Sequence, residues 1–220
     1  MTKLMLNQPT LFLLYGFPGA GKTYFARQLC DELQAAHVQG DRIRHELFEE
    51  RRYDRQENDI VTHLMEYMTE ELLHAGISVV FDMNAMRLSQ RRELRDLARR
   101  NKSQSILVWF QLDADSAFTR SIKRDRRRID DKYSDSLDRT TFESLISGMQ
   151  NPTLSENYMV ISGKHTFPTQ RSAVIKKLYD MGLLQSQQTT VGIAKPALVN
   201  LVPNNSGGRV DPSRRNIAIK

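Results

Sequence analysis

Cysteine and long apolar runs are almost absent from this sequence of 220 residues. Its one cysteine, Cys30, has no partner for a disulfide within the chain, so a reduced cytoplasmic setting is expected. No segment reaches the length of a membrane span, and no basic stretch followed by a long apolar run opens the chain. The five histidines are scattered without the spacing of metal ligands. The sequence thus favours a cytoplasmic protein without a membrane span or a histidine metal site.

Positive charge is in excess. The 32 lysines and arginines against 26 aspartates and glutamates give a net charge of +6 and a pI near 9.5. This balance favours polyanionic partners, among them nucleotides, nucleic acids and phosphorylated metabolites, although many soluble proteins are mildly basic. A chain of this length has room for one domain with its own core and a tail.

Residues 11–15 form a short apolar run that leads into the sequence GFPGAGKT at 16–23. This is the phosphate-binding loop pattern G-x-x-x-x-G-K-[ST], placed between an expected strand and an expected helix. Its glycines allow backbone N–H groups to point at phosphate oxygens, and the helix N-terminus adds its dipole. Lys22 is expected to reach the β- and γ-phosphates of ATP, and Thr23 to bind Mg²⁺ through its hydroxyl. The predicted ATP contacts are Gly16, Pro18, Gly19, Ala20, Gly21, Lys22, Thr23 and Tyr24.

The fold class follows from further apolar runs that are typical of strands. They lie at 37–39, 77–81, 106–111 and 158–161. Helical patterns separate them, which favours a parallel sheet covered on both faces. The expected fold is therefore α/β: a P-loop NTPase three-layer sandwich with a five-stranded parallel sheet and a helical lid.

Two of the expected helices have a clear apolar face. In the helix over 55–75 that face comprises Ile60, Leu64, Met68 and Leu72. Asp54 and Glu57 form a possible capping box before it, and Gly76 ends it. The helix over 88–100 is expected to turn Leu88, Leu94 and Leu97 inward. Most of its arginines, at 91, 92, 95, 99 and 100, are expected to form a solvated outer face.

The domain limits follow from a change in composition. Residues 1–184 are expected to form the kinase domain, with the lid at about 114–141 and a helix over 114–128 that ends in a basic cluster. From 185 to 220 the chain is rich in Gln, Asn, Ser, Gly and Pro, which predicts a flexible tail.

A phosphate-binding loop also occurs in motor ATPases and GTP switches, and the sequence disfavours both. A motor-type ATPase commonly carries a glutamate after the aspartate that ends its strand, but Met83 follows Asp82 here. A GTP switch should carry Asn-Lys-x-Asp after a late strand, and the nearest string, at 101–104, lacks the aspartate and precedes a strand. Phosphoryl transfer to a bound acceptor remains.

Such a reaction needs a carboxylate near the acceptor hydroxyl. Asp41 follows the second strand, and the carboxyl ends of strands in open α/β sheets face the ligand crevice. Asp41 could therefore accept the proton of the hydroxyl, while Arg44, one helical turn later, binds the acceptor. The alternative for Asp41 is a helix N-cap, and both roles are compatible.

Three segments together resemble a known family. The sequence GFPGAGKT at 16–23, then Asp-Arg-Ile-Arg at 41–44, and Phe-Asp-Met-Asn at 81–84 before an arginine-rich helix are similar to the polynucleotide 5′-kinase and zeta-toxin-like branch of P-loop kinases. A P-x-x-x-E stretch from Pro152 to Glu156 agrees with it, and the resemblance spans about 10–165. Met83 departs from the pattern, which usually has Thr or Ser there.

The resemblance implies roles for individual residues. It makes Asp41 the general base, and Arg44 a residue of the acceptor site. It assigns Asp82 and Asn84 to the support of the phosphate loop and the acceptor site, with Asp82 a second candidate for the Mg²⁺ site.

The same resemblance implies a mobile lid that places arginines over the transferred phosphate. Arg124 and Arg128 have the family-like spacing and would share one face of a helix. An arginine there would neutralise the charge that develops on the phosphoryl oxygens. The alternative is a basic surface helix.

The predicted function is thus that of a Mg²⁺- and ATP-dependent kinase that phosphorylates a hydroxyl. The acceptor stays open between a nucleic-acid 5′ end and a small molecule, because the basic helices offer almost no aromatic side chains for base stacking. The rival hypothesis is a nucleotide-switched ATP-binding protein that acts through a protein partner. The oligomeric state is not predicted.

Overall fold

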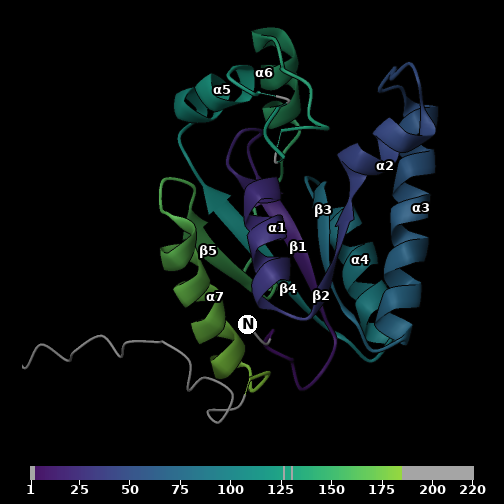
Figure 1. Ribbon diagram of the computed structural model, residues 1–220, viewed down its shortest axis with the longest axis vertical. Coiled ribbons are helices and arrows are strands. Elements are labelled where there is room, and N and C mark those ends of the chain that lie inside the picture. The colour runs from purple at the N-terminus through teal and green to yellow at the C-terminus, as the bar shows by residue number, and fades with distance from the viewer. Residues whose placement is uncertain (1–2, 126, 130, 185–220) are drawn as a thin grey trace, which may run out of the picture. The chain divides into compact units, whose positions relative to one another are not determined.

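The computed structural model describes residues 3–125, 127–129 and 131–184 (Figure 1). Five parallel strands form one sheet in the order β2-β3-β1-β4-β5. The strands are β1 (Thr10–Gly16), β2 (Ala35–Gln39), β3 (Ser78–Asn84), β4 (Gln104–Gln111) and β5 (Tyr158–Ser162). This arrangement confirms the predicted α/β fold class, and each strand overlaps a segment predicted as a strand.

Seven helices occur in the described part of the chain. They are α1 (Lys22–Glu32), α2 (Gly40–Leu47), α3 (Arg55–His74), α4 (Leu88–Arg100), α5 (Ala114–Ile122), α6 (Arg139–Ser147) and α7 (Phe167–Asp180). Figure 1 shows α5 and α6 above the carboxyl ends of the strands. The helix predicted over 114–128 is wrong in its length, since α5 ends at Ile122. The predicted tail at 185–220 lies outside the described residues.

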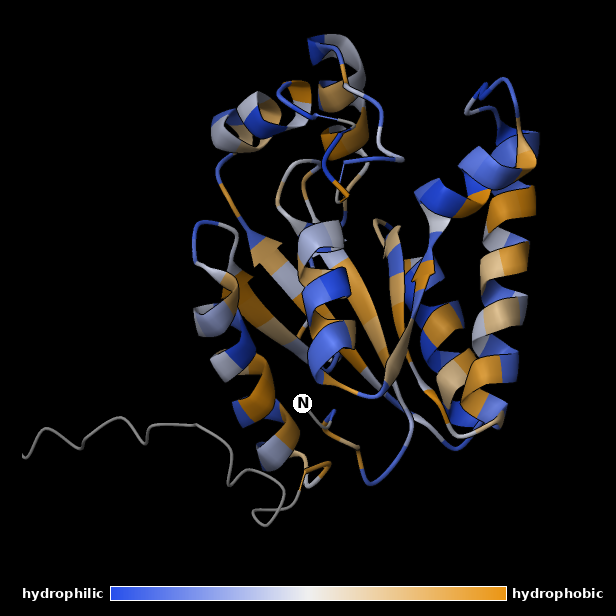
Figure 2. Ribbon diagram, viewed as in Figure 1, coloured by the Kyte–Doolittle hydropathy of each residue, from blue (hydrophilic) through white to orange (hydrophobic). Residues whose placement is uncertain are grey.

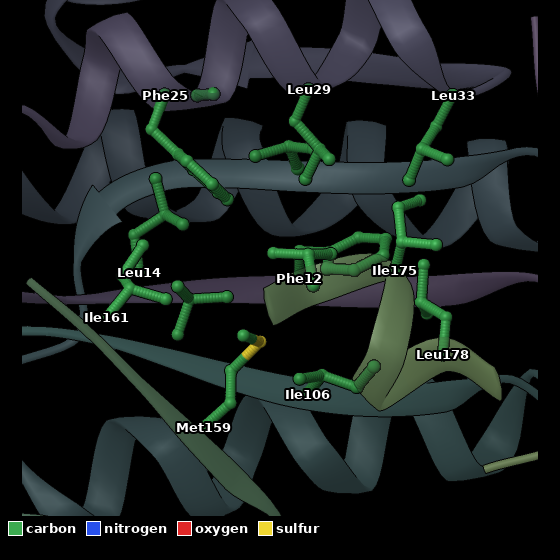
Figure 3. Packing of buried hydrophobic residues seen from close by; sticks show 14 of the residues in the cluster. Phe12, Leu14, Phe25, Leu29, Leu33, Ile106, Met159, Ile161, Ile175 and Leu178 are labelled. Carbon is green, nitrogen blue, oxygen red and sulfur yellow. The ribbon is translucent and has the colours of Figure 1, made fainter. Parts of the chain in front are cut away.

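The core occupies both faces of the sheet because β1 is buried along its whole length. Phe12 and Leu14 belong to a cluster with α1 and α7, which Figure 3 shows in close-up. Leu11 and Leu13 alternate with them and belong to the cluster under α3 and α4. Full burial of such a side chain contributes about 1.5–3 kcal/mol. Figure 2 shows the result, apolar strands inside and largely polar outer helix surfaces.

The inward face of α3 differs from the prediction. The buried residues are Glu57, Val61, Met65, Thr69 and Leu73. Ile60 and Met68, which belong to the predicted apolar face, are 43% and 37% exposed. Val61, Met65 and Leu73 of the buried row belong to the core cluster on this face of the sheet. Glu57 can lie in the same row because Arg44 of α2 forms an ion pair with its buried carboxylate.

The ends of α3 match the prediction more closely. The Asp54 carboxylate accepts a hydrogen bond from the Glu57 N–H at 2.8 Å, as an N-cap does. Glu57 does not complete the capping box, because its carboxylate accepts from the N–H groups of Arg52 and Tyr53 instead. Gly76 follows the helix with a φ of 79°, the left-handed conformation that suits glycine there.

Arg91 departs from the predicted outer face of α4. Its side chain is fully buried and forms a two-pronged ion pair with Glu156, Nε to Oε1 at 2.8 Å and Nη2 to Oε2 at 3.1 Å. The guanidinium also donates to the carbonyl oxygens of Ala85 and Met86. Arg91 therefore joins the start of α4 to the segment before β5.

None of the helices in the described residues is both long and apolar enough to cross a membrane. Within the same residues, no group of three or more His, Cys, Asp or Glu side chains could hold a metal ion.

Candidate active site

The phosphate-binding loop joins β1 to α1 by a turn that requires glycine. Gly19 and Gly21 have φ values of 83° and 92°, in the left-handed region. A Cβ on Gly19 would lie 2.2 Å from the carbonyl oxygen of Ala117 in α5, so a side chain cannot fit there. The N-cap position of α1 is Gly21, which brings no side chain to the first N–H groups of the helix. These N–H groups can therefore bind an anion.

Lys22 lies across this loop. Its Nζ donates to the carbonyl oxygens of Gly16 at 2.8 Å and Phe17 at 2.9 Å. Burial lowers the pKa of Lys22 to about 8, and Arg124 adds to this effect while Asp82 and Asp41 oppose it. The charged groups that shift the pKa of Lys22 thus come from three elements: Asp82 from β3, Asp41 from α2 and Arg124 from the segment after α5.

Thr23 and Asp82, the two predicted Mg²⁺ residues, lie together. The Thr23 hydroxyl donates to Asp82 Oδ1 at 3.4 Å. Hydroxyl and carboxylate oxygens are the ligands that Mg²⁺ prefers. Asp82 Oδ2 also contacts Nε2 of His37 at 3.0 Å. His37 was not predicted as a site residue. The pairing of β2 with β3 explains its position: Gln39 lies opposite Asp82, and His37, two residues earlier on the same strand, lies diagonally from Asp82.

Asp41 lies in the first turn of α2, directly beyond β2. Its Oδ2 accepts a hydrogen bond from the Ser134 hydroxyl at 3.2 Å. Burial raises the pKa of Asp41, and the Asp82 carboxylate raises it further, whereas Arg124, Ser134 and Arg44 lower it to a smaller extent. The interpretation of Asp41 as an N-cap is wrong, since the N-cap of α2 is Gln39.

Arg44 lies on α2 beyond Asp41, and its side chain is turned toward α3. Nη1 donates to Glu57 Oε1 at 2.6 Å and Nη2 to Asn58 Oδ1 at 2.7 Å. The guanidinium also stacks on the Tyr53 ring at 4.7 Å. Burial raises the pKa of Glu57, but the hydrogen bonds from Arg44 and two backbone N–H groups outweigh it and lower the pKa. Nε of Arg44 is buried and has no hydrogen-bond partner among the described residues.

Asn84 supports the phosphate-binding loop directly. Its Oδ1 accepts from the N–H of Gly16 at 3.3 Å. A change of register between β1 and β3 makes this possible, because Leu13 pairs with Phe81 but Leu14 pairs with Asn84. The side chain of Asn84 therefore reaches the first residue of the loop.

Arg124 and Arg128 are not on one helix, so the prediction that they share a helix face is wrong. α5 ends at Ile122, and Lys123 is its C-cap. Arg124 acts electrostatically on both Lys22 and Asp41, and its Nη1 donates to the carbonyl oxygen of Asp135. The side chain of Arg128 is exposed. Of the two predicted lid arginines, Arg124 is the one that the structure brings to Lys22 and Asp41.

The segment after α5 also contacts α2 and the loop that follows it. Tyr53 donates its hydroxyl to the Asp135 carboxylate, and Arg51 forms an ion pair with that carboxylate at 3.5 Å. Tyr133 packs edge-on against the His45 ring at 5.3 Å. With the bond from Ser134 to Asp41, these contacts place residues 133–135 directly over the carboxylate predicted as the base.

A family model described as an AAA domain (AAA_33) matches residues 11–152. The chain belongs to this AAA domain family. The match covers the phosphate-binding loop, Asp41, Asp82 and the lid segment, which are the parts that form the site. A comparison with curated proteins gives no match for this AAA domain protein.

Solved structures of low sequence identity share the fold of this AAA domain protein. Chaetomium thermophilum Kti12, solved with ADP-AlF3, is 16% identical over 80% of this chain and 99% of its own, with a TM-score of 0.59. The Mycobacterium tuberculosis APS kinase CysC, solved with AMPPNP and APS, is 17% identical over 78% and 98%, with a TM-score of 0.55. A gluconokinase from Sinorhizobium meliloti 1021 is 13% identical over 79% and 93%, with a TM-score of 0.53. The fold is thus that of a P-loop kinase, while the polynucleotide 5′-kinase and zeta-toxin-like branch is not confirmed.

Sequence reasoning missed several residues that lie at this site of the AAA domain protein. Ser134 and Asp135 lie in a polar stretch with no motif, and only the fold brings them to Asp41 and Tyr53. Arg120 of α5 was not predicted as a site residue, and its Nη1 donates to the carbonyl oxygen of Gly163 at 2.7 Å. Gly163 lies close to the loop, since a Cβ there would be 3.0 Å from the Ala20 oxygen.

Proposed function

We propose that the protein is an ATP-dependent phosphotransferase that transfers the γ-phosphoryl group to a hydroxyl of a nucleic-acid 5′ end or a small molecule. The observation that carries this proposal is the convergence of Lys22, Asp82, Asp41 and Arg124 at one phosphate-binding loop. Phosphoryl transfer uses a lysine that binds phosphate, a carboxylate that helps to hold Mg²⁺, a carboxylate that accepts a proton and an arginine that neutralises charge. Lys22, Asp82, Asp41 and Arg124 are residues of these four types, in that order. The likeness to a gluconokinase and an APS kinase supports the same reaction class.

ATP and Mg²⁺ are bound by the phosphate-binding loop, the start of α1 and the end of β3. The loop N–H groups and Lys22 bind the triphosphate, with Tyr24 beyond the loop on the exposed side of α1. Thr23 and Asp82 would hold Mg²⁺, which neutralises phosphate charge when bound. Asn84 holds the loop through Gly16.

Asp41 is the general base of the proposed reaction. It takes the proton of the acceptor hydroxyl, whose oxygen forms a bond to the γ-phosphorus as the bond to the leaving ADP oxygen breaks. Its raised pKa makes the carboxylate a stronger proton acceptor, provided that it is ionised. Arg124 neutralises charge on the transferred group. Arg44 acts on the acceptor side of the site. Its guanidinium, which is paired with Glu57, stacks on the Tyr53 ring and so fixes the loop that follows α2.

A second candidate function is favoured by the Ser134 contact. The buried Ser134 donates a hydrogen bond to Asp41, which is itself only partly exposed, so the lid segment restricts the access of an acceptor to this carboxylate. Such a lid also suits a nucleotide-switched ATP-binding protein, in which lid movement is read by a protein partner and ATP hydrolysis resets it.

The two candidates differ in where the γ-phosphate goes. The wild-type protein is incubated with γ-labelled ATP and Mg²⁺, together with a 5′-hydroxyl oligonucleotide, a protein-free small-molecule extract, or neither. Label on the oligonucleotide or on a small molecule is the expected result and assigns the acceptor class. Release of free phosphate alone, at the same rate in all three reactions, would contradict the kinase and favour the switch.

A further inference from the structure

A pocket of about 530 Å³ adjoins the phosphate-binding loop on the side of β1 that faces β4. Its lining comes from the carboxyl ends of three strands and from the segment before β5. The lining residues that matter here are Tyr15, Phe17, Trp109, Met149, Asn151 and Lys164. Gly16 belongs to the lining and is also a predicted ATP contact, whereas Lys22 and Thr23 are not part of the lining. The pocket therefore adjoins the start of the phosphate-binding loop but lies away from the residues assigned to the phosphates and Mg²⁺.

Aromatic rings form the walls of this pocket. The rings of Tyr15 and Trp109 meet edge to face, with centroids 5.9 Å apart and planes at 71°. Tyr158 supports Trp109 in the same way at 6.0 Å. Tyr15 is only 2% exposed, so the accessible ring surface comes from Trp109 and Phe17, which are both half-buried. Ring walls of this kind bind other flat rings by stacking or edge contact.

The walls are also held rigidly. The Tyr15 hydroxyl donates to Asn151 Oδ1 at 3.0 Å, and the Arg91 guanidinium lies over the Tyr15 ring at 5.2 Å. Arg91 in turn is fixed by its buried ion pair with Glu156. Arg91 Nη2 also lies 3.5 Å from the carbonyl oxygen of Asn151, so the fixed guanidinium holds two residues of the lining, Tyr15 and Asn151, in place.

The charges of the lining indicate a neutral ligand. Its charged residues in the described chain are Asp113 and Lys164, and they form an ion pair with each other at 2.9 Å. Gln111, Asn151 and Ser162 bring amide and hydroxyl groups to the same lining. These groups can pair with hydrogen-bonding groups on the edge of a ring.

We propose that this pocket is a second ligand site, which binds a neutral planar heteroaromatic ring that carries hydrogen-bonding groups on its edge. The site adjoins the nucleotide site at Gly16, takes a different ligand, and does not depend on the proposed phosphoryl transfer. Its ligand contacts Phe17 of the phosphate-binding loop, whose ring packs against Phe142 of α6 at 6.5 Å.

The chain contains one tryptophan, Trp109, which makes the test direct. Protein labelled with 5-fluorotryptophan gives one ¹⁹F resonance, from the wall of the pocket. It is titrated with nicotinamide and hypoxanthine as planar probes and with glucose as a non-planar one, in the presence of saturating AMPPNP and Mg²⁺. The expected result is a saturable shift of the resonance with at least one planar probe, with a Kd below about 10 mM, and none with glucose.

Two variants keep the fluorine signal and separate the pocket from the rest of the surface. Met149→Arg places a long charged side chain in the pocket and is expected to weaken the binding of the planar probe at least about tenfold. Tyr67→Ala removes an aromatic ring that is 62% exposed on α3 and should leave binding unchanged. AMPPNP binding by each variant shows that it is folded.

Three results would overturn the proposal. No saturable shift with either planar probe would exclude the ring site. An equal shift with glucose would contradict the class of ligand. Binding that occurs only without AMPPNP would mean that the nucleotide itself occupies the pocket, so the site is not a second one.

Discussion

Asp41→Asn is expected to lower kcat for phosphoryl transfer by roughly 10²–10⁴-fold, the usual contribution of a general base. The amide has the size of the carboxylate and can still accept the bond from Ser134, so the fold should be kept. The Kd for ATP should change little, because Lys22 and the loop N–H groups hold the phosphates. Lys22→Ala, in contrast, should weaken ATP binding as well as turnover.

The matched control for this variant is Asp59→Asn, since Asp59 is an exposed carboxylate on α3 that pairs only loosely with Arg55. Steady-state kinetics and calorimetric titration with ATP measure kcat and Kd separately for each variant. Normal turnover by Asp41→Asn would exclude Asp41 as the base. A large loss of ATP affinity with unchanged kcat would make Asp41 a nucleotide-binding residue.

Arg91→Leu is expected to lower the free energy of unfolding by about 3–5 kcal/mol, because it leaves the buried Glu156 carboxylate with only the distant Arg95, at 3.8 Å, as an ion-pair partner. The side chains of both residues are at most 1% exposed, so water cannot replace the lost contact. Urea unfolding at neutral pH measures the change. The double variant Arg91→Leu/Glu156→Leu should recover part of the loss, since it removes the buried charge that has lost its close partner.

The pH dependence of this pair has a definite sign. Burial raises the pKa of Glu156, but the hydrogen bonds from Arg91 and the Thr153 N–H outweigh it, so the pKa is lowered in the folded protein. The stabilisation is therefore present above the ordinary pKa of 4.5 and is lost as the pH falls through the lowered pKa.

The control for Arg91→Leu is Arg99→Leu, on the exposed side of α4, which should have little effect on the free energy of unfolding. A similar small effect for Arg91→Leu would contradict the account of the pair.

The fold could be predicted from local patterns because each strand is a short apolar run and the loop motif requires a strand before it and a helix after it. The loop, Asp82 and Asn84 could be placed for the same reason, since strand ends meet at one edge of a parallel sheet. The inward face of α3 could not, because it includes the charged Glu57, whose ion-pair partner Arg44 lies on a different helix.

The lid was the least predictable part. A run of basic residues suggested one long helix, but α5 ends at Ile122 and the chain turns back so that Ser134 reaches Asp41. The burial of Arg91 could not be predicted either. An arginine on an arginine-rich helix usually faces solvent, and the partner of Arg91, Glu156, is 65 residues away in the sequence. Both features depend on contacts that are distant in sequence.

The pH profile of kcat/KM for ATP tests the central claim most directly. Asp41 must be ionised to accept a proton, and burial raises its pKa, so activity should fall on the acid side at a pH above its ordinary value of 3.8. Lys22 must be protonated, and its pKa of about 8 places the fall on the alkaline side near that pH. In Asp41→Asn, the residual activity should lose the acid limb and keep the alkaline limb. An acid limb that persists unchanged in Asp41→Asn would show that another group is the base.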